Sequence, residues 1–120
     1  MPMTDPLEKV RQAALALPGT EERLSHGQPT FFVAGKQFAQ FRANHHGDAR
    51  TVVCVRVANF DEQAMLLEAD PVTYSKPAYL PSWISINLAA DEVDWDHVGD
   101  RIAASWELAA PRRLLEAGGR

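Results

Sequence analysis

The feature that most constrains the fold is a run of eight residues, RTVVCVRV, at positions 50–57. Branched residues are favoured in strands, and successive strand side chains point to opposite faces of a sheet. The two alternating sets are Thr51, Val53, Val55, Val57 and Arg50, Val52, Cys54, Arg56. The run therefore predicts a strand that buries the first set and directs two arginines and a cysteine to the other face.

Helix signals flank this strand-rich middle. Asp5 precedes Pro6, an acid follows three residues after Asp5, and Pro18-Gly19 stops the apolar period, which predicts a first helix between them. Asn59 repeats the capping spacing, and Asp70-Pro71 ends a second helix because the residue before proline disfavours helical angles. A third helix is predicted from near Asp94, followed by a short turn.

Three further apolar runs predict strands. TFFVA and QFAQFR flank Gly35-Lys36 and predict a tight hairpin after a polar connector. WISINL, at 83–88, sends Ile84, Ile86 and Leu88 to one face and Trp83, Ser85 and Asn87 to the other. With a short strand before this run, the order is α-β(3)-α-β(2)-α. It predicts a two-layer α+β fold, an antiparallel sheet with helices packed on one face.

Length and composition agree with one domain over residues 1–120. A chain of 120 residues, 46% hydrophobic and 23% charged, has an ordinary globular composition. No apolar run approaches the roughly 20 residues that cross a bilayer, so we expect a cytoplasmic protein without a membrane partner. The single cysteine, Cys54, has no partner for a disulfide or zinc site and is expected to be buried.

Charge is unevenly distributed along the chain. The net charge of −4 does not favour nucleic acid, but Thr30–Val57 holds four basic residues against one acidic residue, a net charge of +3. From Pro77 onward, seven acidic residues face four basic ones, a net charge of −3. The molecule is therefore mildly bipolar.

Several weak motifs together resemble the MmcQ/YjbR family. They are ALPGTEE, FFVAGKQFAQF, VCVRV, the SW-I-I-L pattern and IAASWELAAPRRLL, within a core of about 5–116. The resemblance implies a fold grouped with CyaY-like and type III secretion chaperone-like proteins, and a DNA-binding role as a double-wing domain with hairpins as wings. It implies no catalytic residues. Arg56 and Trp106 are mild departures, because the family commonly has Lys and Tyr there.

Three polar clusters have simple structural explanations. His26 lies in a His-Gly-Gln-Pro bend and is a weak ligand candidate, although glycine and proline serve such a bend for backbone reasons alone. His45, His46 and Asp48 are metal-ligand types, but adjacent histidines diverge and no fourth ligand is evident. The acids at 91–96 complement the positive end of a helix. We therefore expect no metal, no cofactor and no catalysis, with a small enzyme using His26 as the least favoured reading.

The face opposite the predicted core offers the main candidate site. Arginine beside an aromatic ring suits stacking on bases and suits a protein interface equally well. The first hypothesis is a non-catalytic DNA-binding module, with phosphate contacts at the hairpin ends and a base contact on the sheet face; its candidate residues are Lys36, Arg42, Arg50, Arg56 and Trp83. The second is a protein-interaction or small-ligand module using this face, or a homodimer formed across it. A third alternative is that arginine stems or the Pro-rich bend simply cover Trp83.

Overall fold

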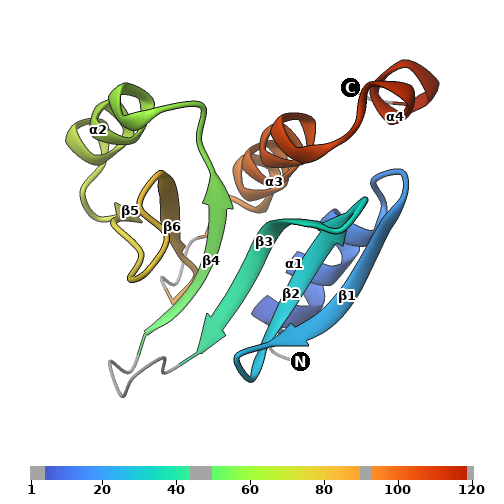
Figure 1. Ribbon diagram of the computed structural model, residues 1–120. Coiled ribbons are helices and arrows are strands. Elements are labelled where there is room, and N and C mark those ends of the chain that lie inside the picture. The colour runs from blue at the N-terminus through green and yellow to red at the C-terminus, as the bar shows by residue number, and fades with distance from the viewer. Residues whose placement is uncertain (1–4, 44–49, 90–92, 119–120) are drawn as a thin grey trace.

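The computed structural model describes residues 5–43, 50–89 and 93–118. Its elements are α1 (Pro6–Leu15), β1 (Thr20–Ser25), β2 (Gln28–Val33), β3 (Lys36–Ala43), β4 (Thr51–Arg56), α2 (Phe60–Ala69), β5 (Tyr74–Ser75), β6 (Trp83–Asn87), α3 (Trp95–Ala109) and α4 (Arg112–Gly118). The described strands form one antiparallel sheet in the order β1-β2-β3-β4-β6-β5 (Figure 1). The predicted α+β class is confirmed.

The helix starts follow the predicted caps. The Asp5 side chain accepts a hydrogen bond from the Leu7 amide at 3.1 Å. Asn59 accepts from the Glu62 amide at 2.9 Å, and the Glu62 carboxylate accepts from the Ala58 amide at 2.8 Å. Of the two α2 bonds, the first is an N-cap, and the second is a variant of the capping box in which Glu62 reaches the amide one residue before the cap. These local signals place α1 and α2 close to their expected positions.

One strand was not predicted. Thr20–Ser25, expected as a polar connector, forms β1 and pairs along its length with β2, so four strands rather than three precede α2. His26 and Gly27 have φ angles of 53° and 77°, the left-handed conformation that suits a tight hairpin turn. An edge strand tolerates polar side chains. One of them, Glu22, accepts two hydrogen bonds from the Arg11 guanidinium of α1.

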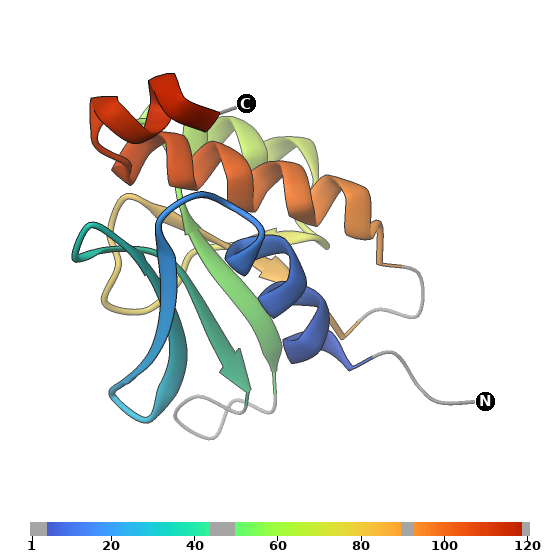
Figure 2. The ribbon, with the colours of Figure 1, turned by 90° about the vertical axis from the view of Figure 1, so that its right-hand side faces the viewer.

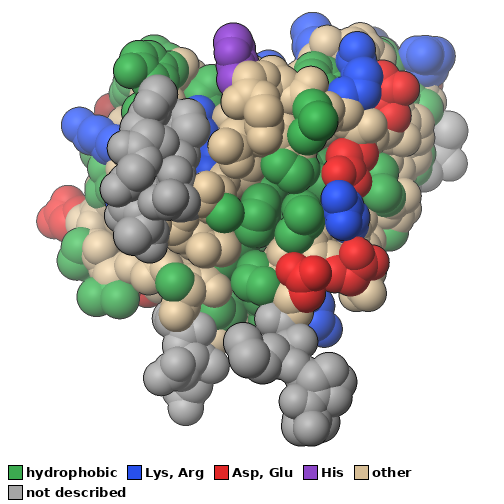
Figure 3. All heavy atoms as spheres, turned by 90° about the horizontal axis from the view of Figure 1, so that it is seen from below, with side chains coloured by type: hydrophobic (Ala, Val, Ile, Leu, Met, Phe, Trp, Pro, Cys, Tyr) green, Lys and Arg blue, Asp and Glu red, His purple; other side chains and the backbone are tan. Residues whose placement is uncertain are grey.

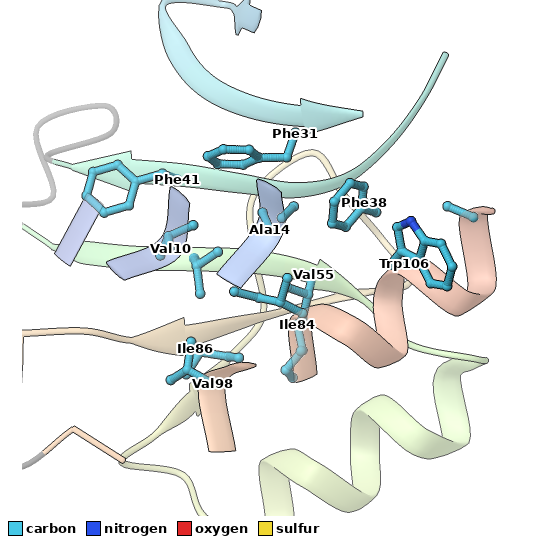
Figure 4. Close-up of a cluster of buried hydrophobic side chains, with 14 of the residues drawn as sticks. Val10, Ala14, Phe31, Phe38, Phe41, Val55, Ile84, Ile86, Val98 and Trp106 are labelled. Atoms are coloured by element: carbon cyan, nitrogen blue, oxygen red, sulfur yellow. The ribbon is translucent and has the colours of Figure 1, made fainter. Parts of the chain in front are cut away.

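Helices α1 and α3 cover one face of the sheet, and α4 continues beyond α3 (Figures 1 and 2). The core lies between these layers, and Figure 4 shows side chains from α1, β2, β3, β4, β6 and α3 meeting there. The residues predicted to face inward from positions 53–57 and 84–88 are all buried, namely Val53, Val55, Val57, Ile84, Ile86 and Leu88. Trp106 is fully buried, and its indole nitrogen donates to the Pro18 carbonyl at 3.0 Å.

A buried hydroxyl closes a gap in the sheet. The recorded pairing of β3 with β4 begins at Ala39 and Val55, so the next backbone groups need other partners. Ser105 on α3 donates to the Phe38 carbonyl and accepts from the Arg56 amide at 2.8 Å. A serine hydroxyl can do both at once, so α3 is tied to two strands by a single side chain.

In the described part of the chain, none of the helices has the length and apolar character that a membrane span requires.

Candidate ligand-binding site on the outer sheet face

The outer face, opposite α1 and α3, is not an open surface. Residues 76–82 run between β5 and β6, and Leu80 from this segment packs against Val52, Cys54 and Trp83. Trp83 is only 5% exposed. The period-two prediction put Cys54, Trp83 and Ser85 on one face, and the cross-strand pairs Cys54–Ser85 and Arg56–Trp83 agree with it. The Pro-rich bend therefore covers the Trp83 indole, as the third alternative stated.

Arg56 and Trp83 lie together, as the alternation indicated. The Arg56 guanidinium carbon lies 5.1 Å from the centroid of the Trp83 ring, within the range of a cation–π interaction. Its Nε donates to the Gln37 carbonyl at 2.8 Å. Partial burial lowers the pKa of Arg56 from its usual value. The pair therefore serves the fold, and a role for it in binding nucleic acid stays a prediction.

Arg42 belongs to a buried polar chain that crosses β2, β3 and the 76–82 segment. Its side chain is 6% exposed, its Nε donates to the Gln40 side-chain oxygen at 2.8 Å, and its Nη1 donates to the Ala78 carbonyl at 3.0 Å. The Gln40 amide donates in turn to the Thr30 hydroxyl at 3.1 Å. The Thr30 hydroxyl donates to the Gln28 carbonyl at 3.0 Å. This chain holds the guanidinium in one orientation beneath residues 76–82.

The two exposed candidates stand at opposite ends of the sheet. Lys36 follows the turn at Ala34 and Gly35, whose φ angles are 49° and 80°. Arg50 precedes β4 at the far end of β3, where its Nη2 donates to the Ser75 hydroxyl at 2.7 Å. In Figure 1 the β2–β3 turn and the start of β4 lie at opposite ends of these strands. The five candidate cationic and aromatic residues therefore do not form one continuous surface.

A hollow of about 620 Å³, here called the outer hollow, opens between the β1–β2 turn, β3 and residues 79–80. Its lining combines polar groups with apolar surface and consists of Ser25, His26, Gln28, Gln37, Gln40, Arg42, Tyr79 and Leu80. His26 and Arg42, which the sequence placed in separate candidate sites, meet here. Sequence reasoning missed Tyr79 and the three glutamines. The polar residues within QFAQFR were the available signal, because Gln40 and Arg42 share one face of a strand.

A second hollow of about 310 Å³ lies beside the start of α3. The Tyr74 hydroxyl is hydrogen-bonded to His97 Nε2, and the two rings make an edge contact with centroids 5.9 Å apart. Burial raises the pKa of Tyr74. Hydrogen bonds from Thr73 lower the pKa of nearby Asp70. The Tyr74 hydroxyl and His97 Nε2 are therefore engaged with each other beside this hollow.

The metal and acidic candidates have separate outcomes. Asp94 caps α3 by accepting from the His97 amide at 3.1 Å, as the helix-start explanation predicts, whereas positions 91 and 92 lie outside the described residues. His45, His46 and Asp48 also lie outside them. Within the parts of the chain that the structure describes, no group of three or more metal-ligating side chains is present.

Charged side chains are mixed on the end of the molecule that Figure 3 shows. Hydrophobic side chains run across its middle, and acidic and basic side chains stand next to one another along one side. The residues coloured in that view do not form a broad positive surface of the kind that duplex DNA attracts.

The fold and the outer hollow define a small antiparallel α+β domain with a hollow on its outer sheet face. The family model YjbR matches residues 15–108, and the chain therefore belongs to the YjbR family. The crystal structure of the Deinococcus radiodurans protein DR2400, with family-model domain DUF419, superposes with a TM-score of 0.73 at 15% identity, covering 96% of this chain and 91% of that one. That likeness shows a shared fold. No curated protein sequence matches this chain.

Proposed function

We propose that this YjbR-family domain is a non-catalytic module that binds a small polar molecule in the outer hollow. The observation that carries the proposal is the convergence of three glutamines and a fixed arginine on a hollow of about 620 Å³. Small-molecule sites are typically concave, of roughly 300–1,000 Å³, with a few well-placed polar groups. The sheet places these groups, because β1–β2, β3 and the 76–82 segment each contribute one side.

The lining suits recognition of a molecule with both donors and acceptors. A carboxamide donates and accepts, and Gln40 is oriented by its bonds to Thr30 and Arg42. Leu80 and Tyr79 supply apolar area beside these groups. A preorganised polar group binds at lower cost than one that must be ordered by the ligand.

The same lining argues against catalysis. Ser25 and His26 are neighbours in the hollow, but no hydrogen bond joins them in the described structure, and no carboxylate lines the hollow to orient the imidazole. A hydroxyl nucleophile needs a base at hydrogen-bond distance and a third group that fixes the base.

The test is an NMR titration of the ¹⁵N-labelled protein with a library of small polar fragments. Binding in the outer hollow should shift the side-chain amides of Gln28, Gln37 and Gln40 together. Gln37→Ala should weaken the best fragment about fivefold, because a hydrogen bond to a ligand contributes about 1 kcal/mol. Gln12→Ala, on the exposed face of α1, is the matched control and should leave affinity unchanged. Fragments that shift only residues around His97, or none at all, would contradict the proposal.

DNA binding is the second candidate, and exposed Lys36 at a hairpin end is the observation that favours it. Because Trp83 and Arg42 are buried and Arg56 is partly buried, the phosphate contacts would come from the exposed residues Lys36 and Arg50. Fluorescence anisotropy with labelled duplex DNA at about 50 mM and 200 mM salt tests it, since several phosphate contacts weaken binding by orders of magnitude over that range. Lys36→Glu and Arg50→Glu should each reduce affinity on all sequences alike. Unchanged affinity would remove both residues from any interface.

A protein partner or a homodimer across the outer face is the remaining alternative. It would draw on the exposed side chains at the edge of this face, Leu24 and Tyr79, which are 75% and 79% exposed. Light scattering at increasing protein concentration distinguishes it, because a dimer doubles the mass whereas a small ligand does not.

A further inference from the structure

Arg42 is a buried cation whose recorded partners are all neutral. Two of its N–H groups donate to the Gln40 amide oxygen and the Ala78 carbonyl. Its Nη2 makes no hydrogen bond in the described structure, and it is not among the fully enclosed atoms without a partner. A buried charge is costly unless an opposite charge or further hydrogen bonds compensate it. Arg42 lines the outer hollow, where a bound anion would supply the opposite charge that its partners lack.

Two more cations stand close to Arg42. A small cleft of about 50 Å³ lies next to it, and Arg50, Lys76 and Ser85 are among the residues that line this cleft. Arg42 lines both the cleft and the outer hollow, and none of the described residues that line them carries a carboxylate. Burial raises the pKa of the neighbouring Cys54 thiol, while the charges of Arg42 and Arg50 act in the opposite direction. Both guanidinium groups thus act on the same part of the outer face.

We infer that the ligand of the outer hollow carries an oxyanion group, a carboxylate or a phosphate, and that Arg42 binds this group while Lys76 adds to the local positive potential. This inference rests on the proposed function and specifies its ligand class. A guanidinium matches both oxyanions because its parallel N–H groups can donate to two oxygens at once. Its bonds to Gln40 and Ala78 already hold it in place, so binding costs little side-chain entropy.

The overall charge makes such a local site necessary for an anionic ligand. The chain carries a net charge of −4, which repels anions at long range. A concave site lined by charges of one sign concentrates ions of the other sign. Among the described residues, Arg42 and Lys76 line these spaces without an acidic side chain in either lining, and they provide that local field.

The experiment titrates the ¹⁵N-labelled protein with inorganic phosphate, acetate and chloride at equal ionic strength. We expect a saturable shift of the Arg42 Nε–H resonance with phosphate or acetate and no saturable shift with chloride. Saturation with acetate alone assigns a carboxylate ligand, and saturation with phosphate alone assigns a phosphate ligand. A response that is equal for all three anions, or the absence of a saturable response, overturns the inference.

Variants separate binding from folding. Arg42→Lys keeps the charge but loses the bidentate geometry of the guanidinium. It should lower the affinity for the anion about tenfold or more. Lys76→Met should weaken it by up to about fivefold, because an exposed charge contributes modestly. Lys9→Met removes the same charge from exposed α1, on the opposite side of the sheet, and should have no effect. Equal effects of Lys76→Met and Lys9→Met would refute a local site. If neutral fragments bind the outer hollow but anions do not, the ligand class is wrong and the proposed function stands; if neither binds, both fail.

Discussion

The two faces of the sheet are buried in different ways. On the inner face, apolar side chains from five elements pack beneath α1 and α3, and Trp106 is fully enclosed. On the outer face, Trp83 is almost as inaccessible, but it lies beneath an extended segment at residues 76–82 and beside a chain of polar side chains. Equal burial thus has different sources. A helical cover seals the inner face, whereas a short extended cover leaves room for hollows along its edges.

The largest expected effect is on the inner face. Ile84→Ala should lower the free energy of unfolding by about 2–5 kcal/mol, because truncating a fully buried side chain loses its transfer free energy and leaves a cavity. Urea denaturation measures the change. Leu108→Ala on the outer side of α3, where the side chain is 50% exposed, is the control and should cost much less. Equal losses would mean that the inner core is not packed as described.

The next effect concerns the single hydroxyl that joins α3 to β3 and β4. Ser105→Ala should cost about 1–3 kcal/mol, because it leaves the Phe38 carbonyl and the Arg56 amide without their buried partner. Ser82→Ala removes a hydroxyl from the 76–82 segment and should change stability by less than about 0.5 kcal/mol. A loss for Ser105→Ala no greater than that of the control, again by urea denaturation, would show that the gap in the sheet does not depend on Ser105.

A smaller effect is expected on the outer face. Leu80→Ala removes part of the cover over Trp83 and should cost about 1 kcal/mol, since the side chain is only partly buried. Hydrogen exchange of the Trp83 and Trp106 indole N–H groups tests whether the two faces open separately. Exchange at Trp83 should accelerate, while exchange at Trp106, which is bonded to Pro18 beneath the helices, should not change. Acceleration at both would mean that the two faces open together.

The smallest expected effect on the free energy of unfolding comes from the Cys54 thiol and appears only at alkaline pH. Burial raises the pKa of Cys54 in the folded protein, so the unfolded thiol ionises first. The stability due to the neutral thiol is therefore complete below its ordinary pKa of about 8.5 and is lost as pH rises above it. At pH 9 the loss relative to Cys54→Ala should be below about 1 kcal/mol, and at pH 7 it should be negligible. Parallel pH profiles for the two proteins, measured by urea denaturation, would contradict the raised pKa.

The candidate site was only partly predictable from the sequence. The pairing of Arg56 with Trp83 followed from strand alternation, which is a local property. The position of His26 and Arg42 in one hollow could not be predicted, because it depends on the unpredicted strand β1 and its turn. The bond from Arg42 to Ala78 joins residues 36 positions apart, and no local signal announces it.

By itself, the sequence determined the positions of α1, α2 and α3, the strand alternation and the inner core, because caps and apolar periods act over a few neighbouring residues. The expected turn after Pro111 is instead the helix α4. Only the tertiary structure decided that Thr20–Ser25 forms an edge strand, that Trp83 is covered, and that Arg42, Arg50 and Lys76 line a common cleft. These features depend on the path of residues 76–82 across the sheet. That path is set by contacts between distant parts of the chain, whose energies no local pattern records.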